Sequence, residues 1–422
     1  MVYLKNIIHF SYGDSYGAFS AALRIHKILK KNGFNSLFFC KNKQTDSKHV
    51  IKIKLQLKDL YFRLINKVED KLNLFNNKYY FLEKNRNLLK DINQIEKYIT
   101  FQPDIIILHW ISGFVDLKVI KQLKEKYNCK VYWYLMDMAP MTGGCHYAWN
   151  CIGYTKGCLN CPAVSLIHKN LPSDNLNHKE QMIRDINLEP ISCSTWMTKQ
   201  LRQSQLFKHI KIHEIMLGIN PDIFKPLSEK ELLNIRSKYY LPSNKKIIFF
   251  GSHSITDERK GFNYLVEALK LISKNNSIDP DSTIIVTAGK VISNNIFKNI
   301  TLPHKHIGYL NGDDELAKAY QMATVFVSPS IEDSGPMMIN ESIMCGTPVV
   351  TFKMGVAEDL VLNGETGYIA ELRNIKDLAN GIIKVINLDN QKYKEMRKKC
   401  RKIGLEKCST EVQVKELISL IK

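Results

Sequence analysis

Two carboxylates eight positions apart, Asp333 and Glu341, flank the stretch of this chain best suited to bind a charged ligand. Asp333 follows the apolar run 325–327, which predicts a buried strand, and Glu341 falls in 337–344, which predicts a helix that ends before Gly346. The loop between them gathers backbone N–H groups and the positive end of a helix dipole, which favour a phosphate. Because carboxylates accept hydrogen bonds from hydroxyl groups, the stretch is typical of a site for a phosphorylated sugar.

Two adjacent cationic side chains, Arg259 and Lys260, precede a second predicted helix that follows the apolar strand 246–250. A guanidinium beside an ammonium group suits the two phosphates of a nucleoside diphosphate. The same charges would stabilise that diphosphate as a leaving group. A solvated basic turn is the alternative interpretation.

The stretch 323–350, which closes on Cys-Gly-Thr-Pro-Val-Val at 345–350, resembles the acidic signature of retaining nucleotide-sugar glycosyltransferases of family 4. In that family the two acids are usually both glutamate, whereas Asp333 stands first here and Glu332 is the alternative. The resemblance implies an α/β protein of the GT-B fold, with two Rossmann-like domains facing each other across a cleft. It is strongest to polysaccharide-assembly members with a cysteine-rich loop in the N-terminal domain.

The resemblance also implies roles for single residues. Asp333 would bind the donor-sugar hydroxyl groups, Glu341 the ribose, and Arg259 with Lys260 the diphosphate. Asp137 and His109 would join Asp333 at the reacting carbon, without any catalytic metal. Further donor-binding positions are Gly17, in a glycine loop that is otherwise a tight turn, and Ser334, Gly335, Met337 and Met338 at the helix tip, where Pro336 has no N–H to offer.

Polar residues follow two predicted buried strands in the N-terminal half, 104–108 and 130–135. Carboxyl ends of parallel strands are where open sheets bind ligands, so His109 and Asp137 should lie at one edge. The family stretch at the second strand reads His-Asp, but Met136 replaces the histidine. Either His109 or His146 substitutes for it, or Asp137 does the polar work, or activity is weakened. Packing in the core is the other interpretation for His109.

Four cysteines fall within seventeen residues after this strand: Cys145, Cys151, Cys158 and Cys161. Four thiolates suit a structural zinc ion, although only the last pair has the spacing of a zinc ribbon. An iron–sulfur cluster, disulfides and free thiols stay open as alternatives. Such a site would leave no open position for catalysis, so we expect it to fix the loop 145–161.

The chain of 422 residues is long enough for two domains. We expect an acceptor-side domain at 1–220, a nucleotide-sugar domain at 221–400, and a final helix at 401–422 that crosses back to the first domain. No apolar run reaches eighteen residues and the N-terminus does not resemble a signal peptide, which predicts a cytoplasmic protein. The net charge of +19 lacks the aromatic-basic interleaving of RNA-binding proteins, so we expect no nucleic-acid partner.

One helical segment has a basic amphipathic pattern. Apolar residues recur at helical spacing from Leu57 to Phe75, with Lys58, Arg63, Lys67 and Lys71 off that stripe. Packing of this helix on its own domain is the first interpretation. Contact with an anionic membrane, at the inner face of the plasma membrane, is the second.

These observations predict a retaining, metal-independent hexosyltransferase that moves a sugar from a nucleoside-diphosphate sugar to a lipid-linked saccharide in bacterial surface polysaccharide synthesis. Two rivals remain. One is another GT-B enzyme, a nucleotide-sugar epimerase or a phosphorylase. The other is a catalytically weak nucleotide-sugar-binding protein, which Met136 and the altered first acid would suggest.

Overall fold

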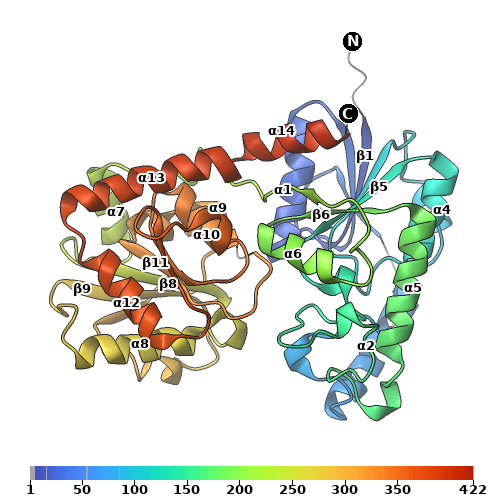
Figure 1. Cartoon of the computed structure of the whole chain (residues 1–422). Helices are drawn as coiled ribbons and strands as arrows, with labels where there is room; N and C mark the ends of the chain where they lie inside the picture. Colours follow the sequence, from blue (N-terminus) through green and yellow to red (C-terminus); the bar gives the residue numbers. More distant parts are fainter. Residues whose placement is uncertain (1–4, 16, 54–55, 85, 336, 422) are drawn as a thin grey trace. The chain divides into compact units, whose positions relative to one another are not determined.

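The computed structural model describes residues 5–15, 17–53, 56–84, 86–335 and 337–421. The chain divides into two compact units, the first made of Met1–Ile215 with Val414–Lys422 and the second of Met216–Gln413 (Figure 1). The second unit therefore begins before residue 220, and the last helical segment is divided between the units at residue 413.

The first unit holds a parallel sheet with the order β3-β2-β1-β4-β5-β6-β7 among its described residues. This is the strand order of a doubly wound Rossmann sheet. The strands after β1 are added on one side of it as far as β3, and from β4 onward they are added on the other side. The strands are β1 (Asn6–Gly13), β2 (Asn35–Asn42), β3 (Val50–Lys52), β4 (Ile105–Leu108), β5 (Lys130–Leu135), β6 (Glu189–Ser192) and β7 (His213–Glu214).

Helices connect and cover these strands. They are α1 (Gly17–Lys31), α2 (Gln56–Lys71), α3 (Asn93–Glu96), α4 (Leu117–Tyr127), α5 (Leu171–Ile186) and α6 (Thr195–Gln203), with short 3₁₀ helices η1 (Asn77–Tyr79), η2 (Ala139–Met141), η3 (Gly153–Thr155) and η4 (Leu166–His168). Local chemistry sets several ends: Ser194 caps α6 by accepting a hydrogen bond from the Met197 amide, as its residue type predicts.

The second unit holds a parallel sheet with the order β10-β9-β8-β11-β12-β13. Strands β9 and β10 are added on one side of β8, and strands from β11 onward are added on the other side. The strands are β8 (Lys246–Ser254), β9 (Thr283–Lys290), β10 (His304–His306), β11 (Val325–Ser328), β12 (Val349–Phe352) and β13 (Gly367–Ala370).

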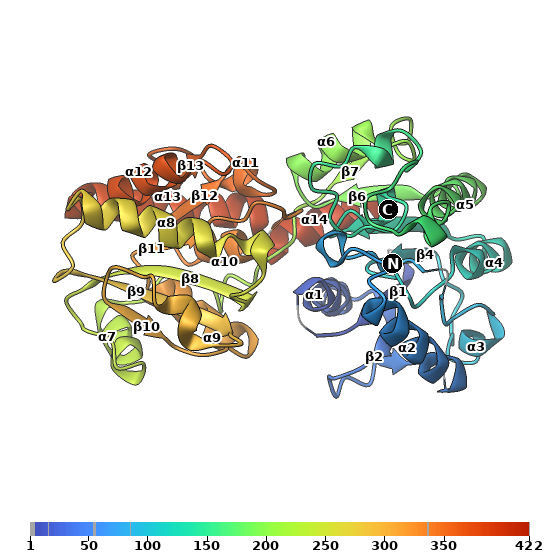
Figure 2. The same cartoon turned by 90° about the horizontal axis from the view of Figure 1, so that it is seen from below.

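Helices cover both faces of this second sheet. Helices α8 and α12 pack together on one face, and α9, α10 and α13 form a connected layer on the other (Figure 1). Figure 2 views this unit from the side that α8 covers. The elements are α7 (Glu229–Lys238), η5 (Glu258–Lys260), α8 (Phe262–Lys274), η6 (Asn294–Phe297), α9 (Gly312–Met322), α10 (Met337–Met344), α11 (Ala357–Leu360), α12 (Ile375–Ile386), α13 (Asn390–Cys408) and α14 (Thr410–Ile421), the last running into the part grouped with the first unit.

The central strands explain why parallel sheets form. Strand β4 reads Ile-Ile-Ile-Leu and β11 reads Val-Phe-Val-Ser, and all eight residues are buried. Continuous apolar runs of this kind need cover on both faces, which helices provide. Because all strands of a sheet point the same way, the loops that follow them meet at one edge, and the polar residues of those loops are brought together there.

Among the described residues no helix is both long and apolar enough to cross a membrane.

Candidate active site

The basic pair and the first acid of the second unit meet at its topological switch point. Strands β8 and β11 are hydrogen-bonded neighbours. Lys260 lies in the turn after β8, and Asp333 lies in the loop after β11. Ligands of open α/β sheets bind outside the carboxyl ends of the strands at such a point.

An ion pair joins these two loops, because the Lys260 ammonium group donates to Oδ2 of Asp333. The Asp333 carboxyl is buried, which by itself would raise its pKa. The positive charges of Lys260 and Arg259, together with the hydrogen bonds from Lys260 and the Gly335 amide, outweigh burial and hold the pKa of Asp333 below its usual value. The site thus keeps a carboxylate ionised at neutral pH.

A glycine lets the two loops approach so closely. Gly261 ends η5 with a φ of 72°, and a Cβ there would lie 1.8 Å from the carbonyl oxygen of Pro329. Only a residue without a side chain fits this contact. The Ile331 amide also donates to the Arg259 carbonyl at 2.8 Å, which fixes the loop after β11 against η5.

A second carboxylate, Asp257, holds the Arg259 guanidinium. Nη2 of Arg259 donates to Oδ2 of Asp257 at 2.5 Å, and the Arg259 amide donates to Oδ1 at 3.1 Å. Asp257 is the residue before η5, where aspartate commonly caps a helix. Sequence reasoning missed this partner, although a capping residue directly before Glu-Arg-Lys was a signal for it.

The same loop leads directly into the first turn of α10. The Gly335 amide donates to Oδ1 of Asp333 at 3.3 Å, so this predicted donor is turned toward the carboxylate. Ser334 is buried, and Met337 and Met338 are half-buried in the first turn of α10. Pro336 lies outside the described residues.

The second acid lies one turn from the end of α10. Glu341 is 3% exposed, and Oε2 of its carboxylate accepts a hydrogen bond from the hydroxyl group of Tyr320 in α9 at 3.1 Å. Its neighbours in the helix, Asn340 and Ser342, are also buried. Sequence reasoning did not identify Tyr320, because a tyrosine twenty-one positions away carries no local signal for this contact.

In the first unit, Asp137 is the second residue after β5. Oδ1 of its carboxylate accepts from the Ala139 amide at 2.7 Å, and Oδ2 lies 3.2 Å from Nδ1 of His146. The His146 ring stacks on Trp110 with 3.9 Å between ring centroids. The structure therefore pairs Asp137 with His146, one of the two histidines named as a substitute for Met136.

The other candidate, His109, lies inside the first unit. Its ring is 2% exposed, and its Nε2 lies 3.1 Å from Nδ1 of His9. Burial and then the charge of His26 lower the pKa of His109 to about 3, so the imidazole is neutral. His109 therefore has the surroundings of a side chain packed in the core.

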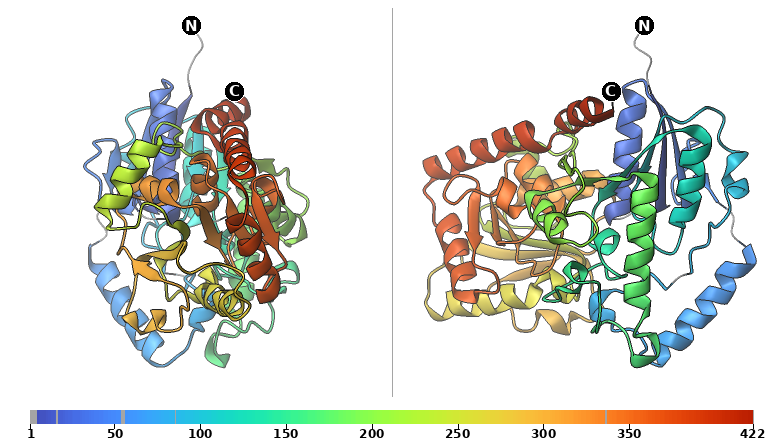
Figure 3. Two further views of the ribbon diagram at one scale, coloured as in Figure 1. Left: turned by 90° about the vertical axis from the view of Figure 1, so that its left-hand side faces the viewer. Right: turned by 45° about the vertical axis from the view of Figure 1, so that its right-hand side comes forward.

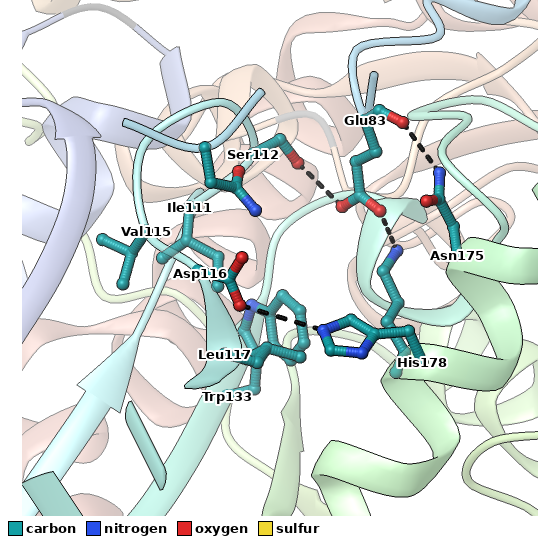
Figure 4. Close-up of a pocket in the computed structure, with 11 residues that line it drawn as sticks. Glu83, Ile111, Ser112, Val115, Asp116, Leu117, Trp133, Asn175 and His178 are labelled. Atoms are coloured by element: carbon teal, nitrogen blue, oxygen red, sulfur yellow. Dashed lines mark hydrogen bonds and ion pairs between the residues drawn. The ribbon is translucent and has the colours of Figure 1, made fainter. Parts of the chain in front are cut away.

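A buried ion pair supports the turn that follows Asp137. The Lys179 ammonium group donates to the carbonyls of Ala139, at 2.6 Å, and Thr142, at 2.9 Å, and also pairs with Glu83. The Asn175 side chain donates to Gly143 O at 2.8 Å. Glu83, Asn175 and Lys179 line a small pocket with Trp133 and His178 (Figure 4), which contains none of the predicted site residues.

Gly17, the predicted donor-binding glycine of the first unit, begins α1 with a φ of 51°. A Cβ there would meet nothing within 4 Å, so its surroundings are open. Its neighbour Tyr16 lies outside the described residues.

The four clustered cysteines form no disulfide. The thiols of Cys145 and Cys161 share a hydrogen bond, which together with burial raises the pKa of Cys145. The same hydrogen bond lowers the pKa of Cys161 to about 7, against the opposing effect of burial. The amides of Gly153 and Gly143 approach Sγ of Cys151 and Cys158 at 3.4 and 3.3 Å.

The zinc interpretation of this loop stays a prediction, which metal analysis of the purified chain would test. In the part of the chain that the structure describes, which includes all four cysteines, no three His, Cys, Asp or Glu side chains are grouped to hold a metal ion.

A comparison with protein families gives a match within the second unit. Residues 233–406 match the family described as glycosyl transferases group 1. The UDP-Gal:alpha-D-GlcNAc-diphosphoundecaprenol alpha-1,3-galactosyltransferase of Escherichia coli is 28% identical over 195 residues, which are 46% of this chain and 49% of that protein. The chain matches 45%, 49% and 53% of the length of three such curated relatives.

Solved structures resemble the whole chain. Sucrose-phosphate synthase from Thermosynechococcus elongatus has a TM-score of 0.69 at 17% identity, over 99% of this chain and 98% of that one. Anabaena HepE in complex with UDP-glucose has a TM-score of 0.66 at 15% identity, over 99% of both chains. At such identities the likeness concerns the fold alone. The chain therefore has the GT-B fold of two Rossmann-like α/β domains, and its residues 233–406 match the group 1 glycosyltransferase family.

Proposed function

We propose that this protein is a retaining glycosyltransferase that moves a hexose from a nucleoside-diphosphate sugar to a saccharide acceptor without a catalytic metal. The observation that carries this proposal is the contact of Lys260 with Asp333 at the switch point of the second unit. A cation for phosphate and an ionised acceptor for sugar hydroxyl groups lie side by side there. The family match of residues 233–406 and the UDP-glucose bound to a structural neighbour support a nucleotide-sugar donor.

The roles of the residues follow from their chemistry. An ammonium group has three N–H donors, and Lys260 spends one on Asp333, so it can also bind a diphosphate oxygen. Arg259, oriented by Asp257, would stabilise the negative charge that grows on the departing diphosphate. Asp333 would accept hydrogen bonds from the donor sugar, and Glu341, oriented by Tyr320, from the ribose.

The first unit would bind the acceptor. Asp137, held by the Ala139 amide and paired with His146, is the polar group of that unit we assign to the reacting carbon. The diphosphoundecaprenol in the name of the E. coli relative supports a lipid-linked saccharide as acceptor. We place the reaction on the cytoplasmic side of a bacterial membrane, in the synthesis of a surface polysaccharide.

A donor screen tests the proposal. Nucleotide sugars with different bases and hexoses are first ranked by the rise in melting temperature of the purified chain, since tight binding to the folded state raises it. The best donor is then incubated with lipid-linked and soluble saccharides, with and without EDTA. We expect transfer with an unchanged anomeric configuration by NMR, and no loss with EDTA. Donor turnover to an epimer, or binding without any transfer, would contradict the proposal.

A further inference from the structure

Helix α2 exposes an apolar row to solvent. Leu60, Leu64, Val68 and Leu72 are 62, 56, 57 and 61% exposed, and Tyr61 beside them is 62% exposed. A spacing of four places such residues on one side of a helix, one turn above another. The sequence favours packing of this stripe on its own domain, and these exposures show that prediction to be wrong for the five residues. Leu57 and Lys58 belong to the same pattern, but their side chains lie outside the described residues.

Polar contacts hold the opposite side of the helix. Glu69 is 5% exposed and binds the guanidinium of Arg86 and the ammonium group of Lys84, the latter at 3.1 Å. Arg86 also donates to the Asn66 side chain at 2.6 Å. A surface helix ordinarily turns its apolar stripe inward and its charges outward. In α2 a charged group faces the domain and the apolar stripe faces away from it, at the outer edge of the first unit (Figure 3, right).

A basic row runs beside the apolar row. Arg63, Lys67 and Lys71 are exposed and again spaced by four. Each follows an apolar residue of the row by three positions, so the two rows are neighbours along the helix. An apolar stripe flanked by lysine and arginine is the pattern of a helix that lies in the plane of a membrane interface.

The tip at η4 continues this surface. Leu166 and Ile167 are 86 and 79% exposed. The Ser165 amide donates to the Leu74 carbonyl at 2.9 Å, which joins this tip to the chain just beyond α2. Lys169, the next cation along the chain, is exposed as well. Two segments almost a hundred positions apart thus present apolar and basic side chains together.

We propose that the outer side of α2 and the η4 tip form a docking surface for an anionic lipid bilayer. The apolar rows would enter the boundary between headgroups and acyl chains, while Lys67 and Lys71 would contact the anionic headgroups. The charge of the whole chain, +19, favours approach to such a surface. The proposal rests on the proposed function only for its purpose, which is to bring the first unit to a lipid-linked acceptor.

The test is co-sedimentation of the full chain with vesicles of phosphatidylcholine, alone or mixed with phosphatidylglycerol. We expect binding to the mixed vesicles that weakens as salt is raised. Lys67→Gln with Lys71→Gln should weaken it about thirtyfold, at about 1 kcal/mol for each charge. Leu64→Ser with Val68→Ser should weaken it by roughly tenfold or more for each side chain.

Matched variants elsewhere serve as controls. Lys394→Gln with Lys398→Gln changes two exposed lysines spaced by four on α13, and Leu233→Ser changes a half-exposed leucine on α7. Neither should alter vesicle binding, and all variants should keep the melting temperature of the parent chain. Equal losses in the control variants, or no binding to mixed vesicles, would overturn the proposal. Self-association of the parent chain that the α2 variants abolish would also overturn it, by assigning the surface to a second copy.

Donor binding separates this inference from the proposed function. The α2 variants should bind the nucleotide sugar as the parent chain does, and Lys260→Met should bind vesicles normally. Vesicle binding that fails while donor binding persists would refute the docking surface alone. The converse result would refute the proposed function alone.

Discussion

The two units place polar side chains in opposite surroundings. At the edge of the second unit, Lys260 and Asp333 form an ion pair, and neighbouring cations keep the aspartate ionised. In the first unit, the buried imidazoles of His9 and His109 stack on each other and burial keeps them neutral. The same sheet topology therefore supports a site that holds charge in one unit and a core that excludes it in the other.

The largest effect should come from breaking the ion pair. Lys260→Met removes the group that would bind the diphosphate and leaves Asp333 buried without its main partner. We expect kcat/KM for the donor to fall by roughly 10²–10³-fold, as when one electrostatic stabiliser of a transition state is lost. Initial rates at varied donor concentration measure this. Lys305→Met, which alters a lysine on β10 away from the pair, is the control and should change little. A tenfold or smaller loss in Lys260→Met would contradict the assigned role.

Acid should destabilise the first unit through its buried histidines. The pKa values of His26 and His109 are lowered from 6.5 to about 3, mainly by burial, so the unfolded chain binds more protons between these values. Stability is thus retained above about pH 6.5 and lost as the pH falls below it. The loss should be about 1.4 kcal/mol per pH unit for each histidine.

Tryptophan fluorescence can follow this loss in the first unit alone, because every tryptophan of the chain belongs to it: Trp110, Trp133, Trp149 and Trp196. Urea unfolding at several pH values gives the slope. His26→Gln should reduce the slope by about one proton, whereas His209→Gln, at an exposed position, should not. A slope that His26→Gln leaves unchanged would show that this ring is already protonated in the fold.

The smallest effect should come from the partner of the second acid. Tyr320→Phe removes only the hydroxyl group that donates to Glu341. Because a hydrogen bond to a charged group contributes about 1.5–3 kcal/mol and water can replace part of it, we expect the donor KM to rise by about tenfold with little change in kcat. Steady-state kinetics separate the two constants. A fall in kcat at constant KM would place Glu341 at the reacting carbon and not at the ribose.

The strands and the tip of the second-unit site could be predicted from local sequence. The apolar run at 325–327 is β11, and the helix predicted at 337–344 is α10 with the same bounds. The contact of Lys260 with Asp333 spans seventy-three positions, so composition and spacing could not reveal it. It follows from the parallel pairing of β8 with β11, for which only the family resemblance gave a reason.

One prediction failed because periodicity is a local property of the sequence. The apolar stripe of α2 has the same period whether it faces a core or solvent. The contacts of its other side with Arg86, seventeen positions beyond Glu69, cannot be predicted from that period. The cysteine spacing at 145–161 admits zinc, and that interpretation stays a prediction. For α2, tertiary contacts, which no window of sequence contains, select among the orientations that the local pattern permits.

The central claim is that Lys260 beside Asp333 binds the diphosphate of the donor. Its most direct test is calorimetric titration of nucleoside diphosphates into the parent chain, Lys260→Met and the control Lys305→Met. We predict that a nucleoside diphosphate binds the parent chain and the control alike, and that Lys260→Met weakens its binding by about a hundredfold while a nucleoside without phosphates is unaffected by the substitution. Equal affinity of the diphosphate for Lys260→Met and the parent chain would contradict the account.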